Sequence, residues 1–390
     1  MKTKAIQQSR ILIVDDIKLN QAMMADMLQS SGFQNTASAM NGSEALEKIS
    51  SFKPDLILLD LILPDMDGYD ICKFVKSSHE TSGISVIVQS AMTQSDQKEK
   101  AFELGANDFL NKPIDKVELI ARVKSQLEQR ALYTKLLDAH KSMSEDLEEA
   151  RELLYSLLPS RENRDSISSK YHVTLDSVYK PSSTLGGDYY NTFAVDDKSF
   201  GVYLWDFSGH GVTAAINTIR LNGAMYDHND HIGKPGVFLT ELNERLRQIE
   251  RKGAYATMFY CVLEPENRTL RYSYASSPPP ILISKKRDSY KLINTREFPL
   301  GVVDHYQFKE EEMDVSEWDA IILYSDALIE TEDQYGNFKN PDDWGKMIVN
   351  ALRKESSVNA TMIKEDIMRH FNENYASRLK DDLTLKVIAF

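Results

Sequence analysis

Acidic side chains that follow short apolar segments are the residues of this sequence best suited to chemistry. Three of them, Asp15, Asp16 and Asp60, occur in "RILIVDD" and "DLILLDLILP". Carboxylates gathered in one crevice repel each other unless a proton or a divalent cation lies between them, so these three imply a Mg²⁺ site. Lys112 and the small hydroxyl of Ser90 also follow apolar segments. Together with a metal ion they suit a site that holds a phosphoryl group on Asp60.

A second set of four acids lies in the C-terminal part of the sequence. They stand beside strand-like runs in "LGGDYYN", "WDFSGHG", "ILYSDALIE" and "KDDLTLKVI", and are Asp188, Asp206, Asp326 and Asp381. Oxygen ligands without a cluster of His or Cys favour hard cations such as Mg²⁺ or Mn²⁺. Two such ions would bridge a water molecule, lower its pKa and clamp a phosphate group for in-line attack. The adjacent Gly186 and Gly187 would keep side chains away from an approaching ligand.

Ser208 and His210 lie close to Asp206 and suggest a different kind of hydrolase. A nucleophile elbow needs glycines two residues before and two residues after the serine. This sequence has Asp206 and His210 at those positions, which disfavours a serine triad. His210 remains open as a general acid or as a residue at the start of a helix, with Gly209 and Gly211 supplying the turn.

The elements that must position the first set of residues lie within residues 10–125. Short apolar runs, "RILIVDD", "DLILLDLILP", "SVIVQSA" and "ANDFLNKP", alternate there with segments of helical spacing. Strands that alternate with helices predict a doubly wound parallel sheet of the α/β class. The functional crevice of such a sheet lies at the carboxyl ends of its strands, which is where Asp15, Asp16, Asp60, Ser90 and Lys112 are expected.

The segment from 115 to 158 contains neither Gly nor Pro and predicts one long helix. From Tyr133 a seam recurs every three or four residues; its members are Tyr133, Leu136, His140, Met143, Leu147, Ala150, Leu154 and Leu157. Charged residues flank the seam, which favours a dimerising coiled coil over a surface helix packed on its own domain. His140 at a seam position weakens the coiled-coil interpretation.

The second set of acids belongs to a region of different pattern. Residues 160–172 are polar and predict a linker, and from 173 strand-like runs predominate, among them "KSFGVYLWDF", "ATMFYCVLEP" and "LTLKVIAF". Helical patterns follow Gly211 and lie around 236–251 and 342–375. This pattern predicts an α+β domain with a largely antiparallel sheet.

Composition limits the partners and the compartment. The chain has 390 residues and a formal net charge of −13, which argues against a nucleic-acid partner or an anionic membrane surface. The two cysteines, Cys72 and Cys261, give no disulfide framework and fit a reducing cytosol. No apolar run approaches the roughly 18 residues of a membrane helix, and the N-terminus has no apolar signal region. We therefore expect a cytoplasmic protein.

The motifs of the first region follow one another in a family-like order. "VDD", "LLDLILPDMDG", "QSA" and "LNKP" resemble the receiver domain of two-component response regulators over about residues 10–127. The resemblance implies a flavodoxin-like fold and phosphorylation of Asp60. It also implies that Asp15, Asp16, Asp60 and the backbone carbonyl of Ile62 bind Mg²⁺.

The same resemblance assigns roles to four further residues. Ser90 would contact the phosphoryl group, Lys112 would pair with it, and Phe109 would be the aromatic switch. The Lys112–Pro113 peptide bond would be cis. The partner that supplies the phosphoryl group would be a sensor histidine kinase or a phosphotransfer protein.

The four acids of the C-terminal region resemble, in order and spacing, those of the PP2C-like metal-dependent serine/threonine phosphatases. The resemblance covers about residues 155–390 and is closest to the stage II sporulation E/RsbU-type branch, which also fits "SLLP", "PPPILI" and "PLGVVDHYQF". It implies an αββα sandwich with two Mn²⁺ or Mg²⁺ ions. Asp206 would bridge both ions and the carbonyl of Phe207 would bind one. Asp188 would hold the second ion and Asp326 with Asp381 the first, supported from behind by Asp382.

Several positions depart from that branch. Asn191 replaces the usual second acid of the first motif, Ala327 replaces a glycine, and Ser276 and Ser277 stand where the family often has Gly-His. None of these changes removes a direct ligand. His210 lies four residues after Asp206, whereas the acid histidine of the broader superfamily lies two after the bridging aspartate.

Together these features predict a receiver domain over 1–127, a coiled-coil linker helix over 128–159 and a phosphatase domain over 160–390. The expected protein is a homodimeric response regulator in which phosphorylation of Asp60 controls a phosphoserine/phosphothreonine protein phosphatase. The resemblance implies a phosphorylated anti-sigma factor antagonist of the STAS type as substrate, in a partner-switching pathway. The alternative is a degenerate phosphatase that binds a partner under receiver control, which Asn191 and Ala327 support.

Overall fold

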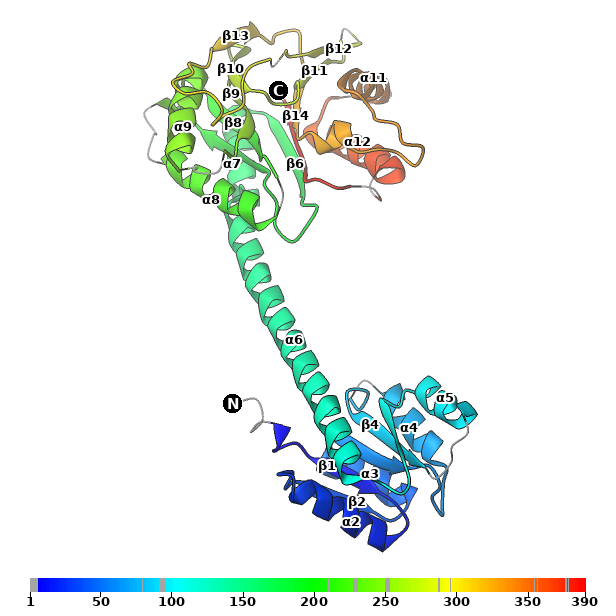
Figure 1. Cartoon of the computed structure of the whole chain (residues 1–390). Coiled ribbons are helices and arrows are strands. Elements are labelled where there is room, and N and C mark those ends of the chain that lie inside the picture. The colour runs from blue at the N-terminus through cyan, green and yellow to red at the C-terminus, as the bar shows by residue number, and fades with distance from the viewer. Residues whose placement is uncertain are drawn as a thin grey trace. The chain divides into compact units, whose positions relative to one another are not determined.

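The computed structural model describes the chain except residues 1–5, 79, 91–94, 210, 227–230, 250–252, 287, 295, 354, 356, 376 and 378. The chain divides into two compact units, Met1–Met143 and Ser144–Phe390, which Figure 1 shows with their elements labelled. No helix formed by the described residues is long and apolar enough to cross a bilayer.

The first unit is built on a five-stranded sheet of order β2-β1-β3-β4-β5 in which every pairing is parallel. Its strands are β1 (Ile11–Val14), β2 (Thr36–Ala39), β3 (Leu56–Asp60), β4 (Ser85–Ser90) and β5 (Asp108–Asn111). Its helices are α2 (Lys18–Gln29), α3 (Gly42–Phe52), α4 (Gly68–Ser77), α5 (Ser95–Glu103) and the start of α6 (Lys116–Leu157). Separate hydrophobic clusters cover the two faces of the sheet. The predicted doubly wound parallel sheet is confirmed.

Two local features hold the turn after β3 next to Asp60. Asp67 caps α4 by accepting a hydrogen bond from the backbone N–H of Tyr69 at 3.0 Å. Gly68 lies so close to the strand that a Cβ there would be 2.4 Å from the carbonyl oxygen of Asp60. Only glycine fits at this position, so the chain turns tightly beneath the acid.

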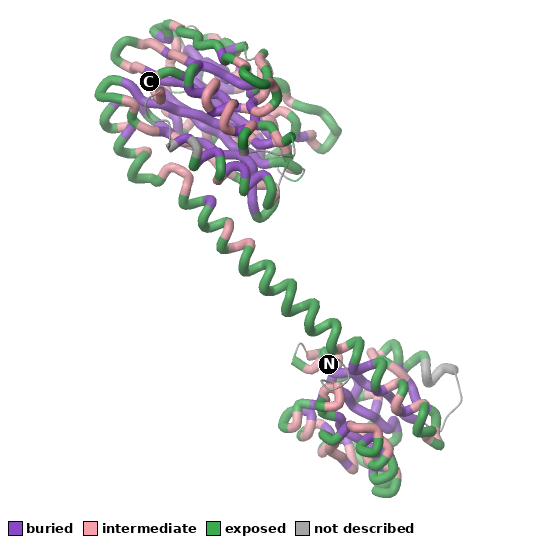
Figure 2. Tube along the Cα trace, turned by 60° about the vertical axis from the view of Figure 1, so that its left-hand side comes forward, coloured by how far each residue is buried: buried purple, intermediate pink, exposed green. Residues whose placement is uncertain are grey.

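Helix α6 runs without a break over Lys116–Leu157, as predicted for 115–158. Residues 131–146 are all exposed (Figure 2), and among them Leu136 and Met143 are 65% and 63% exposed. Further along, Leu147, Ala150 and Leu154 pack within the second unit, in a cluster completed by Leu185, Ala215 and Ile219. The predicted seam therefore has an exposed first part and a second part that packs on its own unit.

The linker predicted for residues 160–172 is wrong, because Arg161–Tyr171 forms helix α7. Ser160 caps it by accepting a hydrogen bond from the N–H of Asn163 at 3.1 Å. Ile167 and Tyr171, four residues apart on one helical face, are both 5% exposed. These two buried side chains anchor the helix. In a polar segment, two apolar residues are too few to form a recognisable helical pattern.

The second unit contains two five-stranded sheets, β13-β10-β9-β8-β7 and β12-β11-β14-β15-β6, in which every pairing within the sheets is antiparallel. The strands of the first sheet are β7 (Tyr189–Ala194), β8 (Phe200–Phe207), β9 (Ala256–Glu264), β10 (Thr269–Ala275) and β13 (Glu311–Asp314). Those of the second are β6 (Thr174–Lys180), β11 (Ile281–Ser284), β12 (Ser289–Leu292), β14 (Ala320–Tyr324) and β15 (Leu383–Ala389).

Helices cover the outer faces of this pair of sheets. They are α8 (Val212–Tyr226) and α9 (Pro235–Ile249) on the first sheet, and α10 (Ala327–Glu330), α11 (Pro341–Leu352) and α12 (Ala360–Asn374) on the second. One hydrophobic cluster fills the space between the sheets, with side chains such as Phe200, Phe259 and Ile321, and one lies beneath each helical layer. The expected αββα sandwich is confirmed.

Candidate functional sites

Asp15, Asp16 and Asp60 meet at the carboxyl ends of β1 and β3. Each can place a carboxylate oxygen within 4.8 Å of the other two. Asp15 is fully buried, and Asn20 donates a hydrogen bond to its Oδ1 at 3.0 Å. The N–H of Ile62 donates to Oδ1 of Asp60 at 3.2 Å. These carboxylates provide the hard oxygen ligands that Mg²⁺ prefers.

Lys112 follows β5 and reaches the same cluster. Its Nζ lies 2.8 Å from Oδ2 of Asp15 and 2.5 Å from Oδ2 of Asp60. Burial acts to lower the pKa of Lys112, but hydrogen bonds to the two carboxylates outweigh it, and the pKa is raised. A permanently protonated ammonium group therefore neutralises part of the acidic cluster. The Lys112–Pro113 peptide bond is cis, as expected.

The remaining first-unit candidates lie close to these residues in the fold. Ser90 ends β4 and is 4% exposed, while Phe109 on β5 is 7% exposed. Ser90 also lines a hollow of about 460 Å³ with Ile62 and Pro64 of the segment after β3. The sheet thus brings Asp15, Asp16, Asp60, Ser90 and Lys112 to the carboxyl ends of its strands, while Phe109 lies within β5 opposite Val88. Residues 91–94 after Ser90 lie outside the described residues.

The four acids of the second unit are supplied in pairs by its two sheets. Asp188 precedes β7 and Asp206 lies near the end of β8, and the pairing of Tyr189 with Trp205 brings them opposite each other. Asp326 follows β14 and Asp381 precedes β15, two neighbouring antiparallel strands. Unlike the first-unit acids, no three of these have oxygens within 4.8 Å of one another.

Burial and repulsion between neighbouring carboxylates raise the pKa values of three of these acids. Burial, followed by Asp326 and Asp381, raises the pKa of Asp206 to about 8. Burial and then Asp381 raise the pKa of Asp326 to about 6. Asp188 is 1% exposed, and burial followed by Asp206 raises its pKa well above the usual range.

Asp188 gives the sharpest sign of a ligand. Both of its carboxylate oxygens are buried and make no well-aligned hydrogen bond to a described residue, although the nearby hydroxyls of Thr384 and Ser325 act to lower its pKa. A buried carboxylate without a partner is costly unless it is protonated or binds a cation. The donor set of aspartate oxygens therefore fits hard divalent cations.

Asp382 braces the segment that leads to Asp188. It accepts hydrogen bonds from the N–H of Ser182 at 2.7 Å and of Gly187 at 2.6 Å. A Cβ on Gly186 would lie 2.6 Å from Oδ2 of Asp382, so this glycine leaves room for Asp382. The predicted role of Gly186 toward an incoming ligand stays a prediction. At Gly187 the carbonyl oxygen of Phe207 would lie 3.3 Å from a Cβ, which places that carbonyl beside the same segment.

Two residues that sequence reasoning missed support the acids. Thr218 on α8 donates its hydroxyl to the carbonyl of Gly187 at 2.6 Å. The hydroxyl of Ser325 donates to the carbonyl of Asp382 at 2.9 Å and accepts from the N–H of Thr384 at 2.8 Å. Ser325 directly precedes Asp326 in "YSDA", so its place in the sequence points to the site. Nothing near Thr218 in the sequence indicates its role.

The remaining candidate residues of the second unit are Ser208, His210, Asn191 and Ala327. The N–H of Ser208 donates a hydrogen bond to the carbonyl of Tyr255, and the hydroxyl of Ser208 accepts one from the N–H of Tyr255 at 3.1 Å. His210 lies outside the described residues. Asn191 contacts Tyr203, with 3.3 Å between its Nδ2 and the tyrosine hydroxyl. Ala327 is buried at the start of α10, directly after Asp326.

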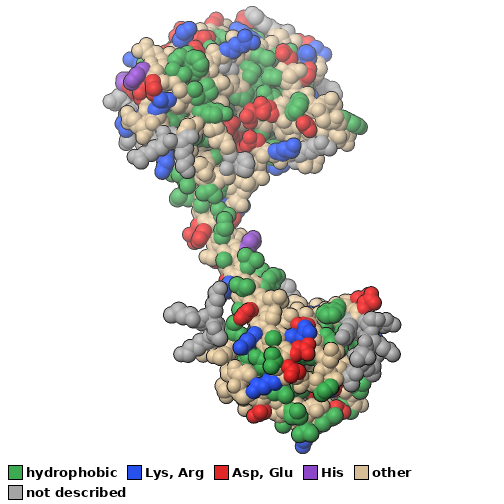
Figure 3. All heavy atoms as spheres, viewed as in Figure 1, with side chains coloured by type: hydrophobic (Ala, Val, Ile, Leu, Met, Phe, Trp, Pro, Cys, Tyr) green, Lys and Arg blue, Asp and Glu red, His purple; other side chains and the backbone are tan. Residues whose placement is uncertain are grey.

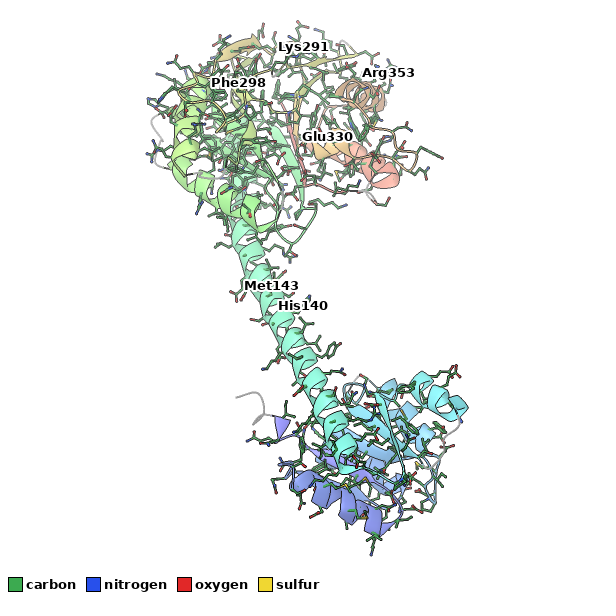
Figure 4. The ribbon with its side chains drawn as sticks, in the orientation of Figure 1. His140, Met143, Lys291, Phe298, Glu330 and Arg353 are labelled. Carbon is green, nitrogen blue, oxygen red and sulfur yellow. The ribbon has the colours of Figure 1, made fainter. Side chains whose placement is uncertain are left out.

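Asp326 and Asp381 line a hollow of about 510 Å³ together with Glu330, Glu332 and Lys380. Acidic side chains gather on the face of the second unit shown in Figure 3, and Glu330 is labelled in Figure 4. The hollow is therefore strongly acidic, and an anionic phosphate group would be repelled from it unless cations were present.

Without divalent cations, we expect the stability of the second unit to fall as the pH rises. The pKa values of about 8 for Asp206 and about 6 for Asp326 lie above their ordinary value of 3.8. Between about pH 4 and pH 8 the folded state therefore binds more protons than the unfolded state, and stability is lost with rising pH. Melting the chain in a chelator at about pH 5 and about pH 8 should show a loss of stability on the order of 5 kcal/mol. Excess Mn²⁺ should restore it, and a pH-independent melt in the chelator would contradict the prediction.

Two family models match the chain. The response regulator receiver domain matches residues 11–124, and Stage II sporulation protein E (SpoIIE) matches residues 196–390, half of the chain. The response regulator PleD of Caulobacter vibrioides is 39% identical over 117 residues, 30% of this chain and 26% of PleD. The DNA-binding response regulator MtrA of Mycolicibacterium smegmatis is 38% identical over 120 residues, 31% of this chain and 51% of MtrA. The matches thus span about a quarter and about half of the length of these relatives.

Among solved structures, the SiaA-PP2C domain of Pseudomonas aeruginosa is similar with a TM-score of 0.56 and 18% identity, over 65% of this chain and 98% of that domain. At this identity the likeness shows a shared fold. Together with the two family models, it accounts for the sandwich of the second unit and the parallel sheet of the first. The chain therefore belongs to the Stage II sporulation protein E (SpoIIE) family and carries a response regulator receiver domain ahead of its SpoIIE domain.

Proposed function

We propose that this chain is a response regulator whose output is a Mn²⁺- or Mg²⁺-dependent protein phosphatase acting on phosphoserine and phosphothreonine. One observation carries the proposal: four aspartates from two sheets lie close enough for their charges to raise the pKa values of Asp188, Asp206 and Asp326, and the buried Asp188 has no hydrogen-bond partner among the described residues. Such a set of carboxylates can all ionise together only when cations are bound, and phosphate-ester hydrolysis is the chemistry that paired cations serve.

In this proposal the residues of the chain hold and orient two cations. Asp206 would contribute to both ions, Asp188 would hold one, Asp326 and Asp381 would hold the other, and the Phe207 carbonyl would supply a further ligand. When bound, the ions supply a water molecule of lowered pKa and neutralise the phosphate. Asp382 and Thr218 fix the segment that carries Asp188. Ser208 is not needed as a nucleophile, since metal-activated water would take that role, and its hydroxyl accepts a hydrogen bond from the N–H of Tyr255.

The receiver would accept a phosphoryl group on Asp60 from a sensor histidine kinase or a phosphotransfer protein. Asp15, Asp16 and the Ile62 carbonyl would hold Mg²⁺ beside it. Lys112, now bound to two carboxylates, would pair with the phosphoryl group, and Ser90 and Phe109 would move in response. The substrate of the phosphatase would be a phosphorylated STAS-type anti-sigma factor antagonist in a partner-switching pathway.

The decisive experiment is hydrolysis of p-nitrophenyl phosphate and of a phosphorylated STAS protein by the full chain. We expect turnover that depends on Mn²⁺ or Mg²⁺ and that changes when beryllofluoride occupies the receiver. Absence of turnover with either substrate at saturating metal would contradict the proposal.

A degenerate phosphatase that sequesters a partner is the alternative. Asn191 in place of an acid and the wide spacing of the four aspartates favour it. Calorimetric titration with Mn²⁺ separates the two possibilities. An enzyme should bind ions in both units, whereas a degenerate phosphatase should bind only at Asp15, Asp16 and Asp60. Repeating the titration with the Asp60→Asn variant identifies the heat of ion binding that comes from the receiver site.

We also expect the chain to be a homodimer held by the exposed part of α6. Leu132, Tyr133, Leu136, Leu137 and Met143 are each more than half exposed there, and Met143 is labelled in Figure 4. A buried seam cannot accept a charge without a partner, so Leu136→Glu should shift the mass measured by light scattering toward the 44.4 kDa of one chain. Ser142→Glu adds the same charge away from the seam and should leave the dimer intact. A wild-type protein that is monomeric at all concentrations would refute the dimer.

A further inference from the structure

A hollow of about 630 Å³ lies in the second unit, apart from the aspartate cleft. It is bounded by the end of α6, the start of α7, strands β7 and β8, and helices α8 and α9. None of the four aspartates is among the described residues that line it. Its volume is typical of a site for a small organic molecule.

The walls of this hollow combine aromatic and aliphatic side chains with polar, uncharged ones such as Ser160, Asn163 and Thr192. Phe193, Tyr203 and Phe238 line one side, with 5.8 Å between the ring centroids of Phe193 and Tyr203. Met225 and Ile232 extend the apolar wall. The described lining residues include no Asp, Glu, Lys, Arg or His. A charged ligand would lose its hydration there without gaining a counter-ion, so the hollow suits an uncharged one.

Two polar atoms of the lining residues lack a partner among the described residues, Oδ1 of Asn222 and Oγ1 of Thr192. Asn222 on α8 is 3% exposed, and its Oδ1 is buried without a hydrogen-bond partner among the described residues. Asn222 stands three residues after Ile219 and seven after Ala215, in the row of α8 that packs against Leu154 of α6. A buried acceptor left without a donor is costly, and a bound N–H or O–H group would remove that cost.

We propose that this hollow binds an uncharged small molecule with an aromatic body and a hydrogen-bond donor. The body packs against Phe193, Tyr203 and Phe238, and the donor meets Oδ1 of Asn222. The site goes beyond the proposed phosphatase activity and does not depend on it. Leu157 in the same lining accepts a hydrogen bond from the hydroxyl of Tyr189 at 2.6 Å, and Tyr189 directly follows Asp188. A molecule bound here therefore contacts the end of α6 at the point where that helix is bonded to the neighbour of a proposed metal ligand.

The test uses N-phenyl-1-naphthylamine, an uncharged aromatic amine with one N–H donor whose fluorescence rises in apolar surroundings. Titration of the full chain should give a saturable rise with one probe bound per chain. 1-Anilinonaphthalene-8-sulfonate has the same ring skeleton plus a negative charge and should bind at least about tenfold more weakly. No saturable rise with the amine, or equal affinity for the sulfonate, would overturn the proposal.

Two variants locate the probe in this hollow. Asn222→Leu removes the acceptor while keeping the size of the side chain, and should weaken binding up to about tenfold. Ser156→Trp, at an exposed lining position, should block the hollow and abolish the rise. Ser169→Trp adds the same indole to an exposed position of α7 outside the lining and should bind as the wild type does. Unchanged affinity in both Asn222→Leu and Ser156→Trp would place the probe elsewhere and refute the assignment.

Discussion

Replacing Asp206 with asparagine is expected to lower kcat/KM for Mn²⁺-dependent phosphate-ester hydrolysis by more than about 100-fold, since changing residues that only orient metal ligands already costs about 10- to 100-fold. Asp206 is the acid whose pKa responds to both Asp326 and Asp381 of the other sheet. It also lies opposite Asp188 within its own sheet. Removing its charge therefore weakens both proposed ion positions at once. Steady-state turnover of p-nitrophenyl phosphate across a range of Mn²⁺ concentrations is the measurement.

The matched control for this variant is Asp197→Asn. Asp197 lies in the turn between β7 and β8, its side chain is 99% exposed, and its ion pair with Lys170 is on the surface. Such a pair contributes little to stability, so activity should stay within about twofold of wild type. In metal-free protein above about pH 8, Asp206→Asn should also melt no lower than wild type, because it removes a repelling charge. Wild-type turnover by Asp206→Asn would show that the cleft is not the catalytic centre.

The two sheets explain why the cleft can be both acidic and stable. Each sheet brings a pair of acids to one end of the sandwich, and residues behind them are already hydrogen-bonded, as Asp382 is to Gly187. The backbone around the acids is therefore fixed before any ion arrives. The cost of gathering the charges is met partly by proton uptake, as the raised pKa values of Asp206 and Asp326 indicate. In the proposed function, an arriving cation would replace those protons.

Strand ends were the most informative feature of the sequence. Asp15, Asp60 and Lys112 each follow a buried run, and a parallel sheet brings such positions to one edge, so their proximity could be predicted. Asp206 and Asp326 were found in the same way, although they belong to different sheets. The sequence pattern predicts that each acid ends or begins a strand. It does not predict which strands pair, and so the grouping of Asp188 with Asp206 needed the structure.

Contacts between residues far apart in the chain could not be predicted. Ser182 and Asp382 are 200 residues apart and form a hydrogen bond of 2.7 Å. Thr218 reaches the carbonyl of Gly187 from a helix whose other polar residues give no hint of this role. Helix α7 was missed because its stability depends on Ile167 and Tyr171 packing on a sheet formed later in the chain. Periodicity describes a local face and cannot identify the surface that the face will cover.

Replacing Asp60 with asparagine is expected to reduce phosphoryl incorporation from acetyl phosphate to background. It should also remove any response of the phosphatase to beryllofluoride. Asp60 is the acid that shares Lys112 with Asp15, and an amide at this position cannot form an acyl phosphate. Lys112 would keep its bond to Asp15 in the variant, so the first unit should remain folded. The measurements are radiolabel incorporation in the presence of Mg²⁺ and the ratio of turnover with and without beryllofluoride.

Asp26→Asn is the matched control, because Asp26 is exposed on α2 and the substitution is the same. It should incorporate label and respond to beryllofluoride as the wild type does. If turnover with and without beryllofluoride were equal in Asp60→Asn but different in wild type and Asp26→Asn, control of the phosphatase would depend on the carboxylate of Asp60. If Asp60→Asn incorporated label as fast as wild type, another residue would be the acceptor, and Asp15 and Asp16 would be the first to examine because their oxygens lie within 4.8 Å of it. Lys112 bridges Asp15 and Asp60. If Lys112→Ala still incorporated label but no longer responded to beryllofluoride, accepting the phosphoryl group would be a separate step from transmitting the signal to the phosphatase.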